Sequence, residues 1–204
     1  MSSRTRANWR LAIVATLAAA GSGCATVYVD NALGDTPASA YHRPATPKPA
    51  QVLFVFKTKG TDNVRATTAF RADVLGTVQQ SGLFSATGPD PAPGGALLSV
   101  VVDNVPVTSE QDAMAKGFAT GLTFGLAGSE ITDGYVCTID YIPAAGAAKI
   151  TVVEHHALHS TIGAHGAPAN STRAPSIKEG VQIMLHQIVG AGLKDLSQNP
   201  AFGN

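Results

Sequence analysis

The spacing of hydrophobic residues changes several times along the chain, and each change predicts a different element. Residues 51–58 form an apolar run rich in branched and aromatic side chains, which predicts a strand buried on both faces. Apolar positions then recur at helical spacing to about residue 80. Thr61 or Asp62 can cap the start of this helix, and Gly82 can end it.

Three later segments have the pattern of strands, namely 96–107, 135–142 and 150–160, the last two joined by a short turn. Ser176 and Glu179 match a capping box, in which the two side chains satisfy free amides at a helix start. Apolar residues follow that box at helical spacing and predict a closing helix. The fold class expected is α+β: a mostly antiparallel sheet of about four strands with two amphipathic helices on one face.

The first 24 residues have a different pattern, which is typical of an export signal. Arg4, Arg6 and Arg10 precede the apolar run 11–20, which is too short to span a bilayer. Small residues then lead to Cys24 and resemble a lipobox, although Gly21 stands where leucine is more usual. We expect 1–23 to be a signal peptide and Cys24 to become a lipidated N-terminus.

Two alternatives to lipidation remain open. Cleavage after Ala20 at an A-x-A site would leave a soluble periplasmic protein, and an uncleaved leader would be a buried helix. If Cys24 is lipidated, Ala25 is not the aspartate that favours retention in the inner membrane of bacteria. The expected location is therefore the outer membrane, with the domain facing the periplasm.

Composition divides the rest of the chain into a tether and one domain. Residues 24–50 are rich in Pro and Ala, which predicts a stiff tether without fixed structure. Residues 51–204 are long enough for a single α+β domain with its own core. Removing the leader takes away three of 14 basic residues and none of 14 acidic ones, so the net charge becomes about −3. This balance argues against nucleic acid as a partner.

A glycine-rich apolar insertion at 114–132 separates two of the predicted strands. Gly117, Gly121 and Gly125 recur every four residues, so in a helix they would form one flat stripe that permits close packing. One interpretation is an arm that contacts a partner or dips into the membrane, and the other is a buried connector. The residues between the glycines that would make the contact are Phe118, Leu122, Phe124 and Leu126.

Histidines are the main candidates for chemistry. His155 and His159 share one face of a predicted strand, while His156 points to the other face with Glu154. With His165 from the next loop, the first two could bind zinc or copper, although exposed strand histidines are the simpler interpretation. The other cysteine, Cys137, fits a buried structural thiol.

Enzymatic activity is not expected, because the sequence contains no nucleophile elbow, phosphate-binding loop or dinucleotide fingerprint. Paired carboxylates at catalytic spacing are not evident either, and no cofactor is predicted.

Several features together resemble a group of small proteobacterial envelope lipoproteins. These are the leader ending at Cys24, the S-G-L-F at 81–84, the G-L-T-F-G-L-A at 121–127, the strand pair that follows and the closing helix. Where a proline is often seen in that group, this chain has 127–129, A-G-S. The resemblance implies an envelope location and a non-enzymatic binding or structural role toward an unidentified envelope partner. The alternative function is a periplasmic metal-binding module built on the histidines.

Overall fold

The computed structural model describes residues 25–107, 115, 130–161 and 166–203. Its centre is one eight-stranded sheet with the order β3-β2-β5-β6-β7-β1-β8, and β4 pairs with β2 beside this path. The prediction of about four strands is wrong, because four strands were missed. The short strands β3, β4 and β8 lie along the two edges, and β1 comes from the segment that was expected to be a tether.

The strands and helices are bounded as follows: β1 Thr26–Asp30, β2 Ala50–Thr58, β3 Thr61–Asp62, α2 Val64–Ser81, β4 Thr87–Gly88, β5 Leu97–Val107, β6 Glu130–Ile142, β7 Ile150–Thr161, β8 Ser171–Arg173 and α4 Ile177–Gln198. A single 3-10 turn, η1, covers Ala38–Ala40. The pairs β5–β6, β6–β7 and β7–β1 are antiparallel, whereas β2 and β5 run parallel because α2 connects them as a crossover.

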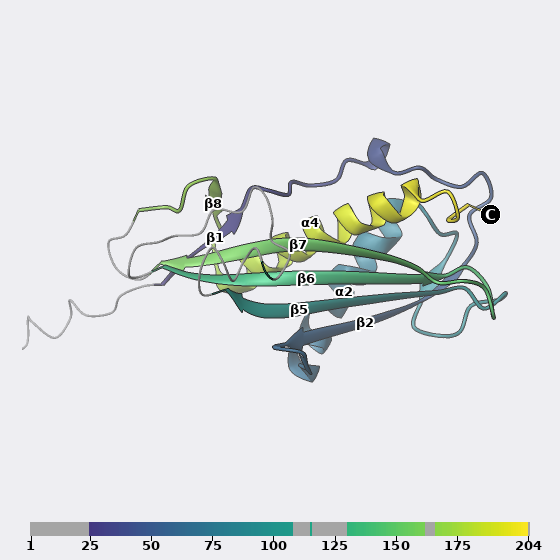
Figure 1. Ribbon diagram of the computed structural model, residues 1–204, viewed down its shortest axis with the longest axis horizontal. Helices are drawn as coiled ribbons and strands as arrows, with labels where there is room; N and C mark the ends of the chain where they lie inside the picture. Colours follow the sequence, from purple (N-terminus) through teal and green to yellow (C-terminus); the bar gives the residue numbers. More distant parts are fainter. Residues whose placement is uncertain (1–24, 108–114, 116–129, 162–165, 204) are drawn as a thin grey trace, which may run out of the picture.

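Both helices lie on the same side of the sheet, behind the strands in Figure 1. Helix α4 covers β6, β7 and β1, and α2 covers β2. The core between the layers is built from alternate residues of each strand, including the fully buried Phe54, Leu98 and Ile139. The other residues of these strands point away from the helices, so β2 is covered on one face only and Leu53 is 39% exposed. We call this second surface the open face.

The helix ends show which local predictions hold. Ser176 caps α4 as predicted, since its hydroxyl accepts the Glu179 amide N–H at 3.2 Å. Gly82 ends α2 in the left-handed conformation at φ 68°. The start of α2 differs, because Asn63 rather than Thr61 or Asp62 accepts the Ala66 N–H at 3.0 Å.

Residues 25–50 do not form a free tether. After β1 the chain crosses the outer side of the helices as an extended strap, residues 31–49. The strap is fixed by the Arg43 side chain, which donates to the Ser81 carbonyl at 3.0 Å, and by the Ser197 hydroxyl, which accepts the His42 N–H at 3.1 Å. Prolines keep this segment extended, but its side chains, including Leu33 and Tyr41, pack on the core. The strap therefore has a fixed path because it packs against residues that are distant in the sequence. Its amino-acid composition alone does not indicate this packing.

Candidate functional site

The histidine cluster of β7 is divided between the two faces of the sheet. His156 lies on the helix side, where its Nε2 donates to Gln187 Oε1 at 2.8 Å and its Nδ1 accepts the Ala157 N–H at 2.9 Å. Burial lowers the pKa of His156, which leaves the ring neutral at pH 7. Both ring nitrogens therefore have partners: Nε2 joins β7 to α4, and Nδ1 accepts a bond within β7.

His159 lies on the open face and forms a three-strand network. Its Nε2 is 3.1 Å from Asp30 Oδ2 on β1, and its Nδ1 is 3.0 Å from the Thr132 hydroxyl on β6. Asp30 also accepts the Ala32 N–H through its other carboxylate oxygen, at 2.7 Å. The imidazole and the carboxylate are fully buried. Sequence reasoning missed Asp30 and Thr132, because their partners come from distant strands.

This network has the order of groups found in hydrolases, a hydroxyl, an imidazole and a carboxylate. In such enzymes the nucleophile must reach a substrate atom, whereas Thr132 is only 8% exposed. The arrangement instead joins β1 to β7 and β6 through buried polar groups that satisfy one another.

The structure does not bring the predicted metal ligands together. His155 and His159 are four residues apart on an extended strand, which separates them by about 13 Å, while a shared zinc ion would need bonds of about 2 Å to both. His165 lies outside the described residues. Within the described ranges, no group of three or more His, Cys, Asp or Glu side chains could hold a metal ion.

A carboxyl pair lies where β7 meets α4. Burial is the main cause that raises the pKa of Glu154 to about 7, and its hydrogen bond to Asp195 and the charge of that group add to the effect.

Cys137, which is the register partner of Glu154 on β6, is completely buried, and burial raises its thiol pKa. The prediction of a buried Cys137 is confirmed.

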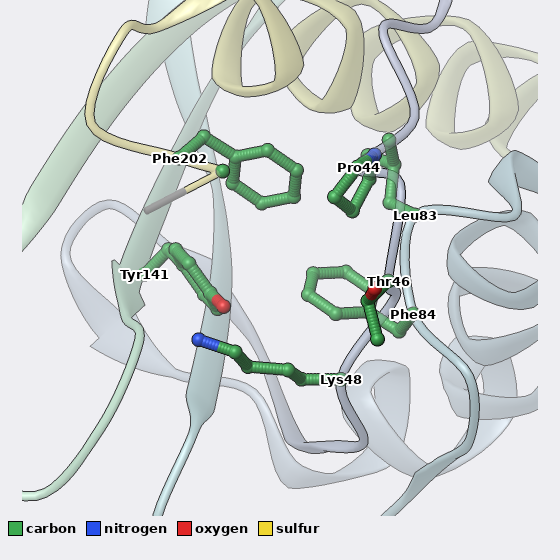
Figure 2. A pocket seen from close by; sticks show the side chains of 8 residues that line it. Pro44, Thr46, Lys48, Leu83, Phe84, Tyr141 and Phe202 are labelled. Carbon is green, nitrogen blue, oxygen red and sulfur yellow. The ribbon is translucent and has the colours of Figure 1, made fainter.

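A small cavity lies at the end of the sheet opposite β1. Figure 2 shows the rings of Phe84, Tyr141 and Phe202 around it, with the Lys48 side chain extending toward the Tyr141 hydroxyl. Ring centroids are 5.1 Å apart for Tyr141 and Phe202 and 5.7 Å apart for Phe84 and Tyr141. The cavity measures about 20 Å³, enough for one water-sized group. Aromatic packing explains this arrangement without a ligand.

The middle of the open face carries a row of branched side chains across four strands. The register aligns Val55, Val101, Thr138 and Val153, which we call the central row. Val153 is 48% exposed, and the other three members are half-buried. Leu53 is the β2 residue of the row on one side of the central row, and Lys57 is the β2 residue of the row on its other side. The central row is thus β-branched, whereas the rows on either side of it contain charged residues, among them Lys57, Asp103 and Asp140.

The strand register also brings distant parts of the chain to one end of the sheet, at the left of Figure 1. Thr26 pairs with Thr161, which pairs with Glu130, and Val107 lies one row further in, opposite Thr132. We call this the β1 end.

The predicted lipid site Cys24 and the predicted contact residues Phe118, Leu122, Phe124 and Leu126 lie outside the described residues. Neither helix in the described part of the chain has the length and hydropathy of a membrane span.

Comparison with known proteins gives no family. No family model matches the chain, and no curated protein matches it. Among solved structures, the chain is similar to a dodecamer of a single-substitution variant of PelC from Paraburkholderia phytofirmans. The identity is 15%, the match covers 84% of this chain and 98% of that chain, and the TM-score is 0.37.

It is also similar to a putative neuraminyllactose-binding hemagglutinin homolog from Helicobacter pylori, with 8% identity, 81% and 88% coverage and a TM-score of 0.39. A minor lipoprotein from Acinetobacter baumannii has 10% identity, 74% and 87% coverage and a TM-score of 0.30. At these identities and TM-scores, the similarity carries no argument about the function of this chain.

Proposed function

We propose that this chain is a lipid-anchored bacterial envelope protein with a non-enzymatic binding or structural role, and that its β1 end faces the membrane. The observation that carries the proposal is the convergence of Thr26, Val107 and Glu130 at that end. The leader ending in Cys24 supplies the anchor, and the outer membrane facing the periplasm is its proposed location.

The start of β1 limits how far the domain can stand from the membrane. Cys24 is two residues before Thr26, so about 7 Å of extended chain separates the lipidated residue from the sheet. A connecting segment of that length keeps the β1 end close to the lipid headgroups. The acyl chains themselves contribute about 0.8 kcal/mol per buried methylene, which makes two or more chains a stable anchor.

The same end bears both borders of residues 108–129, since β5 ends at Val107 and β6 begins at Glu130. We therefore propose the membrane, rather than a protein partner, as the contact of Phe118, Leu122, Phe124 and Leu126. Apolar and aromatic side chains at the headgroup level add binding energy in proportion to the apolar area that they bury.

Lipidation is tested in a Gram-negative host grown with an alkyne-labelled fatty acid. The full chain should take up label, fractionate with the outer membrane and begin at Cys24 with a diacylglyceryl adduct by mass spectrometry. Cys24→Ser should lose the label, and a much smaller fraction of the chain should remain with the membrane. A mature N-terminus at Gly21 without lipid would contradict the proposal.

The second contact is tested with the Cys24→Ser mature chain and anionic phospholipid vesicles. This chain should cosediment with the vesicles, and changing Phe118, Leu122, Phe124 and Leu126 to serine should lower the bound fraction several-fold. Val64→Ser, at a 75% exposed apolar residue on α2, is the matched control and should bind like the parent. Equal binding by all three chains would exclude the membrane contact.

A further inference from the structure

Two exposed isoleucines at the β1 end occupy positions of a kind that faces the core elsewhere in the molecule. Ile131 on β6 lies on the helix side of the sheet, as Cys137 and Ile139 do further along the same strand. Those two residues are completely buried, whereas Ile131 is 55% exposed. The apolar layer between the sheet and the helices is therefore uncovered at this position.

Helix α4 shows the same change along its apolar stripe. Ile177 is the first residue of the helix, and Val181 and Met184 follow it on the same side at helical spacing. Val181 and Met184 are buried, but Ile177 is 64% exposed. Figure 1 shows α4 running from the β1 end toward the opposite end of the sheet, so Ile177 also belongs to the β1 end.

Val27 relates both isoleucines to the predicted lipid site. Ile131 shares a row with Val27 across β7. On α4, a Cβ atom at Gly180 would lie 3.0 Å from Val27 Cγ1, and Ile177 is one turn nearer the start of the helix. Val27 is three residues after Cys24, a separation of at most about 10 Å along the chain. Both isoleucines therefore lie close to the proposed anchor.

Two exposed cations accompany the isoleucines. Lys178 directly follows Ile177, and Arg173 lies on the edge strand β8, which pairs with β1. Glu130 and Glu179 are acidic neighbours in the chain, so these cations give the surface no net positive charge. Long cationic side chains place their stems on apolar groups and their heads near phosphates, which zwitterionic phospholipids also carry. The surface therefore does not need an anionic lipid.

We infer that Ile131 and Ile177 enter the interface of a phospholipid bilayer, with Arg173 and Lys178 at the level of the phosphates. The inference rests on the proposed function, in which the β1 end faces the membrane, and it names the folded residues that set the orientation of the domain. Apolar groups at such an interface lie about 5–10 Å into the boundary between headgroups and acyl chains. Two isoleucines bury too little area to hold the chain there by themselves, so they orient a domain that the lipid already holds.

Tryptophan reporters can test this contact because the only tryptophan of the chain, Trp9, lies in the predicted leader. Ile177→Trp and Val153→Trp are made separately in the mature chain, and Cys24 is coupled to a maleimide-bearing lipid in phosphatidylcholine vesicles. This coupling replaces lipidation by the cell, and Cys137 is too buried to react.

Val153 is the matched control position because it is also exposed but lies far from the β1 end. Its β6 partner, Thr138, is seven residues from Ile131, or about 23 Å along the strand.

The fluorescence of Ile177→Trp should move to shorter wavelength when the chain is coupled to vesicles. Brominated acyl chains should quench it about two-fold or more beyond the quenching of Val153→Trp. Ile131→Trp should behave like Ile177→Trp, and thermal melts check that each variant folds. Emission from Ile177→Trp that the vesicles leave unchanged would overturn the inference. Emission already at short wavelength without vesicles would also overturn it, because the chain itself would then cover this site.

The coupled vesicles also separate this inference from the proposed anchor. If Ile177→Trp is quenched in the coupled chain while Cys24 carries no fatty acid in cells, the anchor alone is refuted. If Cys24 is lipidated in cells while the coupled Ile177→Trp reporter stays in water, the contact of the isoleucines alone is refuted.

Discussion

The two faces of the same four strands differ sharply, and the difference shows which residues build the fold and which remain available. On the helix side, Phe54, Leu98 and Ile139 are almost completely buried. One position along, the open face leaves Leu53 and Val153 exposed in the middle of the sheet. Toward the β1 end, however, the open face is buried again and is polar, with Asp30, Thr132 and His159 bonded to one another.

The largest expected effect tests whether this polar end matters as much as the apolar core. His159→Ala breaks a fully buried pair of imidazole and carboxylate, so we expect a loss of about 3–5 kcal/mol in the free energy of unfolding. Urea unfolding of the Cys24→Ser mature chain measures it. The double variant with Asp30→Ala should lose less than the sum of the two single changes, because the pair fails as a unit. Additive losses would show that the two side chains are not coupled.

The next prediction compares the two faces directly. Ile139→Ala opens a cavity beneath α4 and should cost about 2–5 kcal/mol in the free energy of unfolding. Val153→Ala, on the neighbouring strand but on the open face, should cost less than about 1 kcal/mol because the residue is half exposed in the monomer. Both losses are measured by urea unfolding at low protein concentration. Equal losses would mean that the open face is covered even in the monomer.

The smallest effect concerns Glu154, on the helix side of β7, whose pKa is raised to about 7. An unfolded glutamate ionises near pH 4.5, so between about pH 4.5 and 7 the folded chain holds a proton that the unfolded chain has released. Stability must therefore fall as pH rises through this window.

Because Glu154 is half-buried, solvent screening limits this fall to about 1 kcal/mol. Glu154→Gln should remove it, so the variant gains on the parent as pH rises from 5 to 8. Thermal melts at constant ionic strength measure the change. A parent whose stability is flat over this range would contradict the raised pKa of Glu154, whereas a slope that persists in the variant must come from other groups.

The sequence predicted the parts of this molecule whose signals are local. The capping box at Ser176, the glycine stop at Gly82 and the apolar run of β2 each depend on residues within a few positions, and each was placed correctly to within a few residues. These signals do not report how many strands join the sheet, which is why the predicted number was too low.

Strand β1 shows why the rest was missed. It has only five residues, it precedes a proline-rich segment, and it ends in Asp30, a residue that is unfavourable in strands. Its aspartate is tolerated because His159, 129 positions away, pairs with it. The same non-local pairing hid the network around Thr132. The histidines in the sequence suggested a metal site, but His155 and His159 lie too far apart along the strand to share an ion.

The direction of β1 has a mechanical consequence. The strand begins at Thr26, beside the proposed lipid, and runs inward between β7 and β8, antiparallel to both. A force that pulls the anchor away from the body acts along the strand axis, so it must shear both ladders together instead of opening their hydrogen bonds one at a time. A molecule attached in this way resists extraction more strongly than one tied by a strand that peels from an edge.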